Sequence, residues 1–373
     1  MKILVALGTR PEIVKLAVTV RLLREVADVT VVATGQHFDT DMTDVFFAEL
    51  GVRPDIQFRL PRDPAARVGR ILTDALRQLG TDRPDLVLVV GDTFTVPTYG
   101  LAARSLGIPF VHVEAGLRSF NLRSAEETNR RMGAAAAVLH FAPTELASTF
   151  LQREGVERQR IHVVGNPVLD TLRLRGVERR PPTARHGTLV TAHRASNVDN
   201  VERLAEFVTL LEQLAELAPP VLFPAHPRTV SRLRKAHLFG RLRWAGVEIT
   251  EPLAYGEMLR HIAGASLVVT DSGGLQEEAA WYGVPAVVLR TSTPRWEGVT
   301  AGLATLVGMD SARAVAAARR ALDHEVQEQV FRTPCPYGDG YTSERIVRVI
   351  TDRRTVPLLS LDEPAYLDNR VPV

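Results

Sequence analysis

The chain has 373 residues, of which 45% are hydrophobic and 24% are charged, and its 45 basic and 43 acidic residues give a formal net charge of +2. This length exceeds one compact core of ordinary size, so we expect two domains in a soluble globular protein. The near-balance of charge argues against a general nucleic-acid binder, and the single cysteine, Cys335, rules out an internal disulfide and a cysteine-rich metal site.

The N-terminal residues lack the pattern of a secretory signal. Gly8 and Pro11 interrupt the short apolar run before an h-region and a cleavage site could form. No apolar stretch approaches the roughly 20 residues that a membrane-spanning helix needs. We therefore expect a cytoplasmic protein without a membrane partner.

Short apolar runs alternate with amphipathic helical patterns through the first half of the chain. Each run is continuous rather than alternating, which is typical of parallel strands covered by helices on both faces. Nearly every run ends in Gly, Thr, Asp, Glu or Asn, and the carboxyl ends of strands border the ligand crevice in open α/β sheets. The predicted strands lie at residues 2–8, 28–35, 84–92, 109–116, 137–144 and 160–167.

The second half repeats this alternation after residues 173–187, whose two prolines, several arginines and lack of periodicity indicate a linker. We therefore expect an α/β fold with two Rossmann-like, doubly wound domains and a ligand crevice between them. The expected domains are 1–172 and 188–345, with a C-terminal helix and tail, 346–373, able to pack back on the first. The predicted strands of the second half lie at residues 188–194, 221–227, 247–252, 266–274, 284–290 and 305–308.

The stretch GTRPEIVK follows the first predicted strand and opens a helix. Pro11 suits the first helical turn, and Glu12 favours the positive end of the helix dipole. Arg10 and Lys15 could both face an anion at this helix start, although two surface cations on an ordinary turn would give the same pattern. No G-x-G-x-x-G follows a predicted strand, which argues against a tightly held nicotinamide cofactor.

The stretch TDSGGLQEEA, residues 270–279, is a sharper signal. Asp271 ends an apolar run, and the Ser-Gly-Gly that follows leads directly into a helical pattern. Such small residues suit a diphosphate, because bare N–H groups and the helix dipole can both reach it. Glu278, one turn into the helix, could accept hydrogen bonds from ribose hydroxyls. A glycine-rich turn with a capped helix is the alternative.

Histidines and carboxylates end four other predicted strands. His193 and His226 lack the nearby cysteines or carboxylates, at ligand spacing, that a metal site needs. His193 could contact a phosphate or act as an acid, or it could be an ordinary structural histidine. Asp92 and Glu114 end consecutive runs of the first domain. They are candidates for proton transfer, because partial burial can raise a carboxyl pKa towards neutrality.

Taken together, these motifs resemble the family of non-hydrolysing UDP-N-acetylglucosamine 2-epimerases. They occur in the family's order and span residues 8 to about 345. The resemblance implies the two-domain glycosyltransferase-B-like fold. The shared motifs are GTRPEIVK, GDT, HVEAGLRSF, EETNR, FAPTE, GNPVLDTL, TAHR, TDSGGLQEEA, GVPAVVLR, EGVTAG and PYGDG.

The chemistry implied by the resemblance is inversion at C2 of a UDP-sugar without a cofactor or a metal. A carboxylate removes the C2 proton while UDP leaves C1, which gives a glycal. Re-addition of UDP with protonation from the other face yields UDP-N-acetylmannosamine, for use in a surface polymer or a specialised metabolite. The resemblance also implies a homodimer.

Specific residues acquire roles through this resemblance. Asp92, Glu114 and Glu126 match the family's catalytic carboxylates, and His193 matches the histidine near the diphosphate. The implied substrate contacts are Arg10, Lys15, Ser272, Gly273, Gly274, Glu278 and Arg295. A regulatory site for a second, activating UDP-sugar would involve Gln36, His37, Arg194 and His226.

The resemblance implies that departures from the family pattern lie near the sugar and the regulatory site more than on the diphosphate contacts. Ala125 and Trp296 stand where the family has proline, and Ser196 stands for a glutamate. Beside Ala125, Glu127 is expected to brace Arg130 or Arg131 rather than to act on substrate.

Two alternatives stay open. The first is a hydrolysing relative that releases UDP and free amino sugar, and the GTRPE start counts against it. The second is a glycosyltransferase of the same fold, or a nucleotide-sugar-binding protein without turnover. Retention of the three carboxylates and of His193 counts against a protein without turnover.

Overall fold

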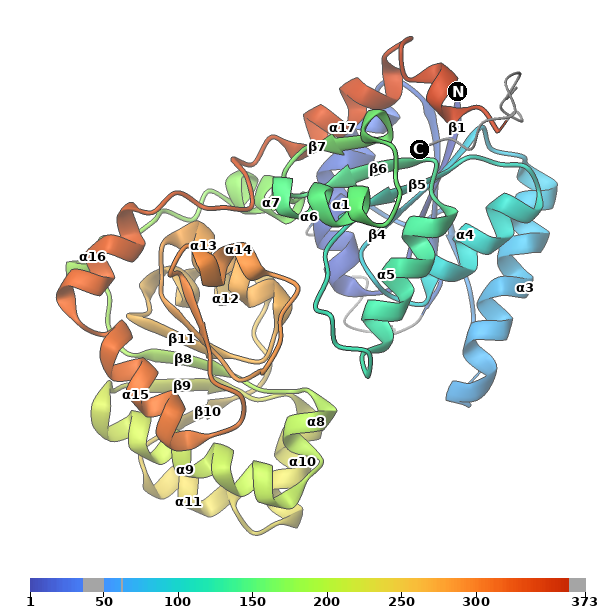
Figure 1. Cartoon of the computed structure of the whole chain (residues 1–373). Helices are drawn as coiled ribbons and strands as arrows, with labels where there is room; N and C mark the ends of the chain where they lie inside the picture. The colour runs from blue at the N-terminus through green and yellow to red at the C-terminus, as the bar shows by residue number, and fades with distance from the viewer. Residues whose placement is uncertain (36–49, 62, 362–373) are drawn as a thin grey trace. The chain divides into compact units, whose positions relative to one another are not determined.

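The structure, a computed structural model, describes residues 1–35, 50–61 and 63–361. The chain forms two compact units, each with its own parallel sheet (Figure 1). Unit 1 consists of Met1–Gly116, Arg123–Pro167 and the chain from Ser343 onward, and unit 2 consists of Leu117–Leu122 and Val168–Thr342. Two Rossmann-like α/β units were predicted from the apolar runs, and this part of the prediction is confirmed.

The sheet of unit 1 has seven strands in the described part of the chain. They are β1 (Lys2–Leu7), β2 (Asp28–Ala33), β3 (Ile56–Gln57), β4 (Leu86–Val90), β5 (Phe110–Val113), β6 (Leu139–Ala142) and β7 (Ile161–Val163). Their order is β3-β2-β1-β4-β5-β6-β7, and each neighbouring pair is parallel.

Helices cover both faces of this sheet, which explains why its strands are apolar throughout. In β1, Ile3, Val5 and Leu7 pack into a core with two helices, the first and the last of those named below, while Leu4 and Ala6 pack into a second core on the other face. The helices of unit 1 are α1 (Arg10–Arg24), α3 (Pro64–Asp82), α4 (Thr95–Ser105), α5 (Ala125–Ala136), α6 (Glu145–Arg153) and α17 (Thr342–Thr351), with short 3-10 turns η1 (Arg158–Arg160) and η3 (Val356–Leu359).

Unit 2 repeats this architecture with a six-stranded parallel sheet. Its strands are β8 (Thr188–Thr191), β9 (Val221–Pro224), β10 (Glu248–Thr250), β11 (Leu267–Thr270), β12 (Ala286–Val288) and β13 (Ala304–Leu306). Their order is β10-β9-β8-β11-β12-β13. The helices are α7 (Val168–Arg175), α8 (Ala195–Val198), α9 (Val201–Leu217), α10 (Pro227–Lys235), α11 (Phe239–Trp244), α12 (Tyr255–Gly264), α13 (Gly273–Tyr282), α14 (Trp296–Thr300), α15 (Ser311–Ala321) and α16 (His324–Arg332), with the 3-10 turn η2 (Pro182–Ala184).

The strand order reverses once in each sheet, between β1 and β4 and between β8 and β11. At such a switch point the connecting helices leave towards opposite faces, so the carboxyl ends of the two strands border an open crevice. The turns after these four strands carry the motifs GTRPE, GDT, TAHR and DSGG. The topology therefore brings the candidate motifs together in pairs, one pair in each unit.

The chain passes between the units at places that differ from the predicted boundaries. Residues 173–187, interpreted above as a linker, lie inside unit 2. Some of their arginines tie this segment to unit 2, because they donate to main-chain carbonyl groups of that unit. Arg173 Nε donates to Gly340 O at 2.7 Å, and Arg185 donates to Tyr282 O and Gly283 O at 2.8 and 2.6 Å.

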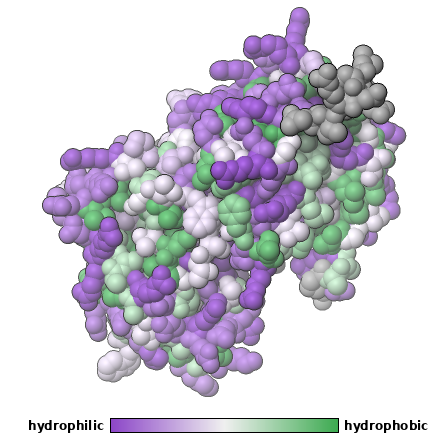
Figure 2. Space-filling model, in the orientation of Figure 1, coloured by the Kyte–Doolittle hydropathy of each residue, from purple (hydrophilic) through white to green (hydrophobic). Residues whose placement is uncertain are grey.

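The visible face of the molecule is mostly hydrophilic, with hydrophobic side chains in scattered patches (Figure 2). Across residues 1–35, 50–61 and 63–361, no helix combines the length and the apolar character needed to cross a bilayer.

Candidate functional site

Glu114 and Lys15 form a nearly buried ion pair in unit 1. The Glu114 side chain is 2% exposed and that of Lys15 is 11% exposed, and Lys15 Nζ lies 2.5 Å from Glu114 Oε2. The second carboxylate oxygen, Oε1, accepts a hydrogen bond of 3.2 Å from Asn166 Nδ2. Three segments thus converge on one carboxylate: the first turns of α1, the end of β5 and the turn after β7.

The backbone of Glu114 is also unusual, with φ at +64°. This left-handed conformation is uncommon for a residue with a Cβ, and it costs of order 1 kcal/mol or more. Because β5 ends at Val113, the strained residue is the first one beyond the strand. Such strain is characteristic of positions where a side chain must be aimed at a site.

Asp92 lies one residue beyond Gly91, in the turn after β4, and α5 holds it. Arg130 pairs with its carboxylate, and Asn129 Nδ2 donates to its main-chain oxygen at 2.9 Å. Arg130 also lies 3.3 Å from Glu127, which is 3.5 Å from Arg131. The predicted bracing role of Glu127 is therefore confirmed.

Glu126 and Arg10 are the other candidate groups in unit 1. Glu126 is partly buried in the first turn of α5 and accepts a hydrogen bond of 2.5 Å from Ser124 Oγ. Arg10 is the first residue of α1, and no group in the described part of the chain accepts a hydrogen bond from its buried Nε.

Glu12, which the sequence suggested only as a partner of the helix dipole, is a buried residue of the same region. Its carboxylate accepts hydrogen bonds from the N–H groups of Gly8 and Thr9 and from Thr93 Oγ1. Burial raises the pKa of Glu12 to about 7, the nearby Asp92 charge adds to this rise, and the three hydrogen bonds oppose it.

In unit 2, Asp271 organises the residues around His193. The Asp271 side chain is fully buried, and its Oδ1 lies 3.1 Å from His193 Nδ1. It also accepts hydrogen bonds from the N–H groups of His193 and Arg194, and from Asn197 Nδ2 at 3.2 Å. This arrangement orients the imidazole of His193 so that Nδ1, and not Nε2, faces the carboxylate. The His193 side chain is 48% exposed.

The balance of forces keeps Asp271 ionised. Burial would raise the pKa of Asp271, but hydrogen bonds and charge from His193 and the N–H of Arg194 outweigh it, so the pKa is lowered from its ordinary value. His226 lies nearby, with its ring centroid 6.4 Å from that of His193. The pKa of His226 is lowered by burial, by His193 and by Arg228. Its Nδ1 accepts from the N–H of Arg228 at the start of α10.

The start of α13 has the form expected of an anion site. Ser272 precedes the helix, which begins at Gly273, so the N–H groups of its first turn point out of the helix end. The guanidinium of Arg295 lies against Gly273, where an added Cβ would be 3.3 Å from it. Arg295 is almost buried and donates from Nε to Glu277 Oε1 at 2.8 Å. A fixed cation therefore reinforces the helix end.

Glu278 is a further candidate residue of unit 2, in α13. It is 5% exposed, and its Oε1 accepts a hydrogen bond of 3.1 Å from the Tyr255 hydroxyl.

The structure places the sequence-predicted residues in two groups. Unit 1 holds Arg10, Lys15, Asp92, Glu114 and Glu126, and unit 2 holds His193, Arg194, His226, Ser272, Gly273, Gly274, Glu278 and Arg295. Gln36 and His37 lie outside the described residues. Sequence reasoning missed the contributions of Glu12, Asn166 and Asp271. For Asp271 a signal existed, since it directly follows a strand at the same sheet edge as His193.

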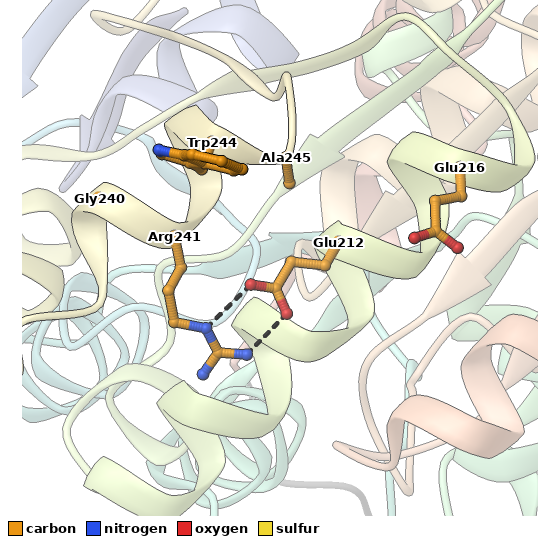
Figure 3. A pocket seen from close by; sticks show the side chains of 6 residues that line it. All are labelled: Glu212, Glu216, Gly240, Arg241, Trp244 and Ala245. Atoms are coloured by element: carbon orange, nitrogen blue, oxygen red, sulfur yellow. Dashed lines mark hydrogen bonds and ion pairs between the residues drawn. The ribbon is translucent and has the colours of Figure 1, made fainter.

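A separate hollow lies between α9 and α11 (Figure 3). Its volume is about 570 Å³, and the Trp244 ring on its wall belongs to a residue that is 95% exposed. Glu212 and Arg241 in this hollow pair with each other at 2.9 and 2.6 Å. It contains none of the candidate site residues.

Comparison with known proteins gives a consistent result. A family model described as UDP-N-acetylglucosamine 2-epimerase matches residues 22–351. The UDP-N-acetylglucosamine 2-epimerase of Methanocaldococcus jannaschii is 37% identical over 368 residues, which cover 94% of this chain and 99% of the relative. The UDP-2,3-diacetamido-2,3-dideoxy-D-glucuronate 2-epimerase of Pseudomonas aeruginosa is 35% identical over 360 residues, with coverage of 94% and 99%. The crystal structure of the M. jannaschii enzyme in complex with UDP-GlcNAc and UDP superposes with a TM-score of 0.85, at 37% identity, and covers 94% of this chain and 99% of that one.

Proposed function

We propose a reaction for this chain from its membership of a family. The chain belongs to the UDP-N-acetylglucosamine 2-epimerase family. It is therefore proposed to interconvert UDP-N-acetylglucosamine, or a close UDP-amino sugar, and its C2 epimer. The observation that carries this proposal is the buried pair of Glu114 and Lys15. The contacts with Lys15 and Asn166 hold this nearly buried carboxylate at a fixed position, which a group that exchanges a proton with substrate requires.

The proposed reaction is an elimination followed by an addition. A carboxylate takes the proton from C2, the electron pair of that C–H bond forms the C1–C2 double bond, and the C1–O bond breaks with its electrons on the UDP oxygen. UDP then adds back to C1 of the glycal while C2 receives a proton on the opposite face. Asp92, Glu114 and Glu126 are proposed to share these two proton transfers.

UDP must be held while it is detached from the sugar. The N–H groups at the start of α13 and the guanidinium of Arg295 are proposed to bind its phosphates, with Glu278 on the ribose. Arg10, at the start of α1, is proposed to donate a further hydrogen bond to the diphosphate. His193, oriented by Asp271, is proposed to donate to the departing phosphate oxygen.

The phosphate assignment can be tested with Gly274→Ala. A Cβ at this helical position would meet only Ser272 Oγ, at 4.0 Å, so the variant should fold with a thermal stability no lower than that of the natural chain. A diphosphate at the helix end would lose close access to the backbone. Losing one or two charge-assisted hydrogen bonds weakens binding by roughly 10- to 100-fold in Kd. Titration calorimetry with UDP measures this.

Gly240→Ala is the matched control, because Gly240 is also helical and a Cβ there meets nothing within 4 Å. It should bind UDP as the natural chain does. Equal UDP affinity in the Gly274→Ala variant would contradict the phosphate assignment.

The reaction itself is tested by incubating the protein with UDP-N-acetylglucosamine in D2O and recording NMR spectra. We expect deuterium at C2 and the appearance of a UDP-sugar of manno configuration. Release of UDP with free amino sugar would instead indicate a hydrolysing enzyme, and turnover only after addition of an acceptor would indicate a glycosyltransferase. Absence of binding by any UDP-sugar would overturn the proposed function.

The same assay should include a UDP-2,3-diacetamido uronate. The P. aeruginosa relative is named for such a substrate and matches this chain about as well as the N-acetylglucosamine enzymes do. The departures from the family pattern at Ala125, Ser196 and Trp296 are proposed to affect the sugar. The ratio of kcat/KM values for the two substrates decides which sugar the chain prefers.

We further propose a cytoplasmic homodimer that provides an amino sugar for a surface polymer, with a regulatory site involving Arg194 and His226. Partly exposed apolar side chains on α3 and α4 suit a contact between copies: Val68, Leu76 and Leu101 are 37%, 36% and 53% exposed. Light scattering after size exclusion tests the dimer, and a monomer at micromolar concentration would contradict it.

A further inference from the structure

Glu12 joins the two turns that border the switch point of unit 1. Its Oε2 accepts from the N–H groups of Gly8 and Thr9, in the turn after β1, the second at 2.9 Å. Its Oε1 accepts from Thr93 Oγ1 at 2.8 Å, in the turn after β4. The residue is 3% exposed, so these bonds are shielded from water. One carboxylate thus connects segments 81 positions apart in the sequence.

Thr93 is held in a tightly packed group of hydroxyls, so a shift of its side chain would move its neighbours. The N–H of Thr95 donates to Thr93 Oγ1 at 3.3 Å, and Thr95 Oγ1 lies 2.9 Å from Thr34 Oγ1. A Cβ at Gly8 would lie only 2.4 Å from Thr95 Oγ1 and 2.8 Å from Thr93 Oγ1. The close approach of these hydroxyls therefore requires glycine at position 8.

The carboxylate of Glu12 also lies close to the reacting groups assigned above. A Cβ at Gly91 would be 3.7 Å from Glu12 Oε1 and 3.4 Å from Glu114 Oε2, so both carboxylates approach the same glycine. The charged groups around this point are Asp92, Glu114 and their partners Arg130 and Lys15. Charge on Asp92 raises the pKa of Glu12, and coupling between two titrations is reciprocal.

We propose that Glu12 is a positioning residue for the epimerisation, because it holds Thr93 and thereby the turn that carries Asp92. The proposal rests on the proposed function, in which Asp92 is one of the reacting carboxylates. A second consequence concerns charge. When Asp92 accepts a proton, the neighbouring negative charge disappears and Glu12 ionises more readily. The ionised form then strengthens its hydrogen bond to Thr93.

The alternative role of Glu12 is a helix cap that affects folding alone. A cap needs only the bonds to Gly8 and Thr9, whereas positioning needs the bond to Thr93. Thr93→Val removes the hydroxyl, and with it the acceptor of the Thr95 N–H, but it leaves the bonds of Glu12 to Gly8 and Thr9 intact. Thr93→Ser keeps the hydroxyl. If Glu12 acts through Thr93, adding Glu12→Gln to Thr93→Val should not deepen the loss of kcat.

The first test compares the steady-state kinetics of Glu12→Gln, Thr93→Val and Thr93→Ser. We expect kcat to fall roughly 10- to 100-fold in Glu12→Gln and Thr93→Val, as for a reacting group displaced by a fraction of an ångström. KM and the Kd for UDP should stay within about threefold, and Thr93→Ser should restore kcat. Glu202→Gln, an exposed first-turn glutamate of α9, is the control. A folded Thr93→Val variant with normal kcat would overturn the proposal.

The second test does not depend on turnover. In protein with 13C-labelled glutamate carboxyl groups, one resonance should titrate near pH 7 and be absent from Glu12→Gln. Asp92→Asn should lower the pKa of that resonance, and an unchanged titration would overturn the link to Asp92. The natural chain could turn over no UDP-sugar while Asp92→Asn still lowers the pKa of this resonance. In that case the proposed function fails and the coupling of Glu12 to Asp92 stands.

Discussion

Replacing Glu114 by glutamine is expected to lower kcat by about 10²- to 10⁴-fold, the range associated with loss of a positioned acid or base. The amide has nearly the same shape, so it can still accept a hydrogen bond from Asn166 and occupy the space at the end of β5. It cannot take a proton from carbon. NMR detection of C2 deuterium exchange measures this loss directly, because that exchange reports the proton transfer itself.

Folding must be measured separately in the Glu114→Gln variant. The change removes the anion that lies 2.5 Å from the almost buried Lys15 ammonium, and breaking a buried pair costs about 3–5 kcal/mol when no other group compensates. Urea unfolding gives the loss of stability, and Lys15→Met combined with Glu114→Gln should recover part of it. Glu157→Gln, at a 59% exposed side chain, is the control and should alter neither quantity. Near-normal turnover in folded Glu114→Gln would remove Glu114 from the proposed reaction.

Asp271→Asn is expected to reduce kcat by a comparable factor, about 10²- to 10⁴-fold. The carboxylate accepts hydrogen bonds from His193, Arg194 and Asn197, so a side-chain amide would turn an N–H group towards at least one of these donors. The imidazole of His193 would lose the partner that fixes its tautomer and direction. His193→Ala should lower kcat at least as far, and the double variant should be no worse than His193→Ala alone.

The pH dependence of stability gives a second measure of Asp271. The pKa of Asp271 is lowered from an ordinary value of 3.8, so its contribution to stability is present above that value and is lost as the pH falls through the lower folded pKa. As the pH falls below about 4, the free energy of unfolding should therefore decrease more steeply for the natural chain than for Asp271→Asn. Full turnover in Asp271→Asn, or additive losses in the double variant, would contradict the proposed pair.

The sequence was informative where residues are close neighbours along the chain. Continuous apolar runs predicted buried parallel strands, and the residue after each run predicted Asp92, Glu114 and His193 at sheet edges. The family resemblance added roles for these residues. The fold places His193 next to Asp271, and the two strands that carry them are adjacent in the sheet.

Contacts between distant segments could not be predicted in this way. Asn166 reaches Glu114 across 52 positions, and nothing in the sequence around either residue specifies the other. Glu12 had a sufficient local explanation in the helix dipole, which concealed its bond to Thr93. The arginine-rich segment 173–187 was interpreted as a solvated linker. Arginine N–H groups donate equally to water and to main-chain oxygen, so the sequence does not distinguish the two cases.

The position of α17 has a consequence for how the protein is made. Ile346 and Ile350 of this helix are buried in the same core as Ile3, Val5 and Leu7 of the first strand. The ribosome therefore releases the strands of the first sheet, and α1, long before it makes α17, the second helix of this core. During synthesis of unit 2, this core lacks the part that α17 contributes. Premature termination anywhere before residue 342 would leave the carboxylates that carry the proposed chemistry on an incomplete core.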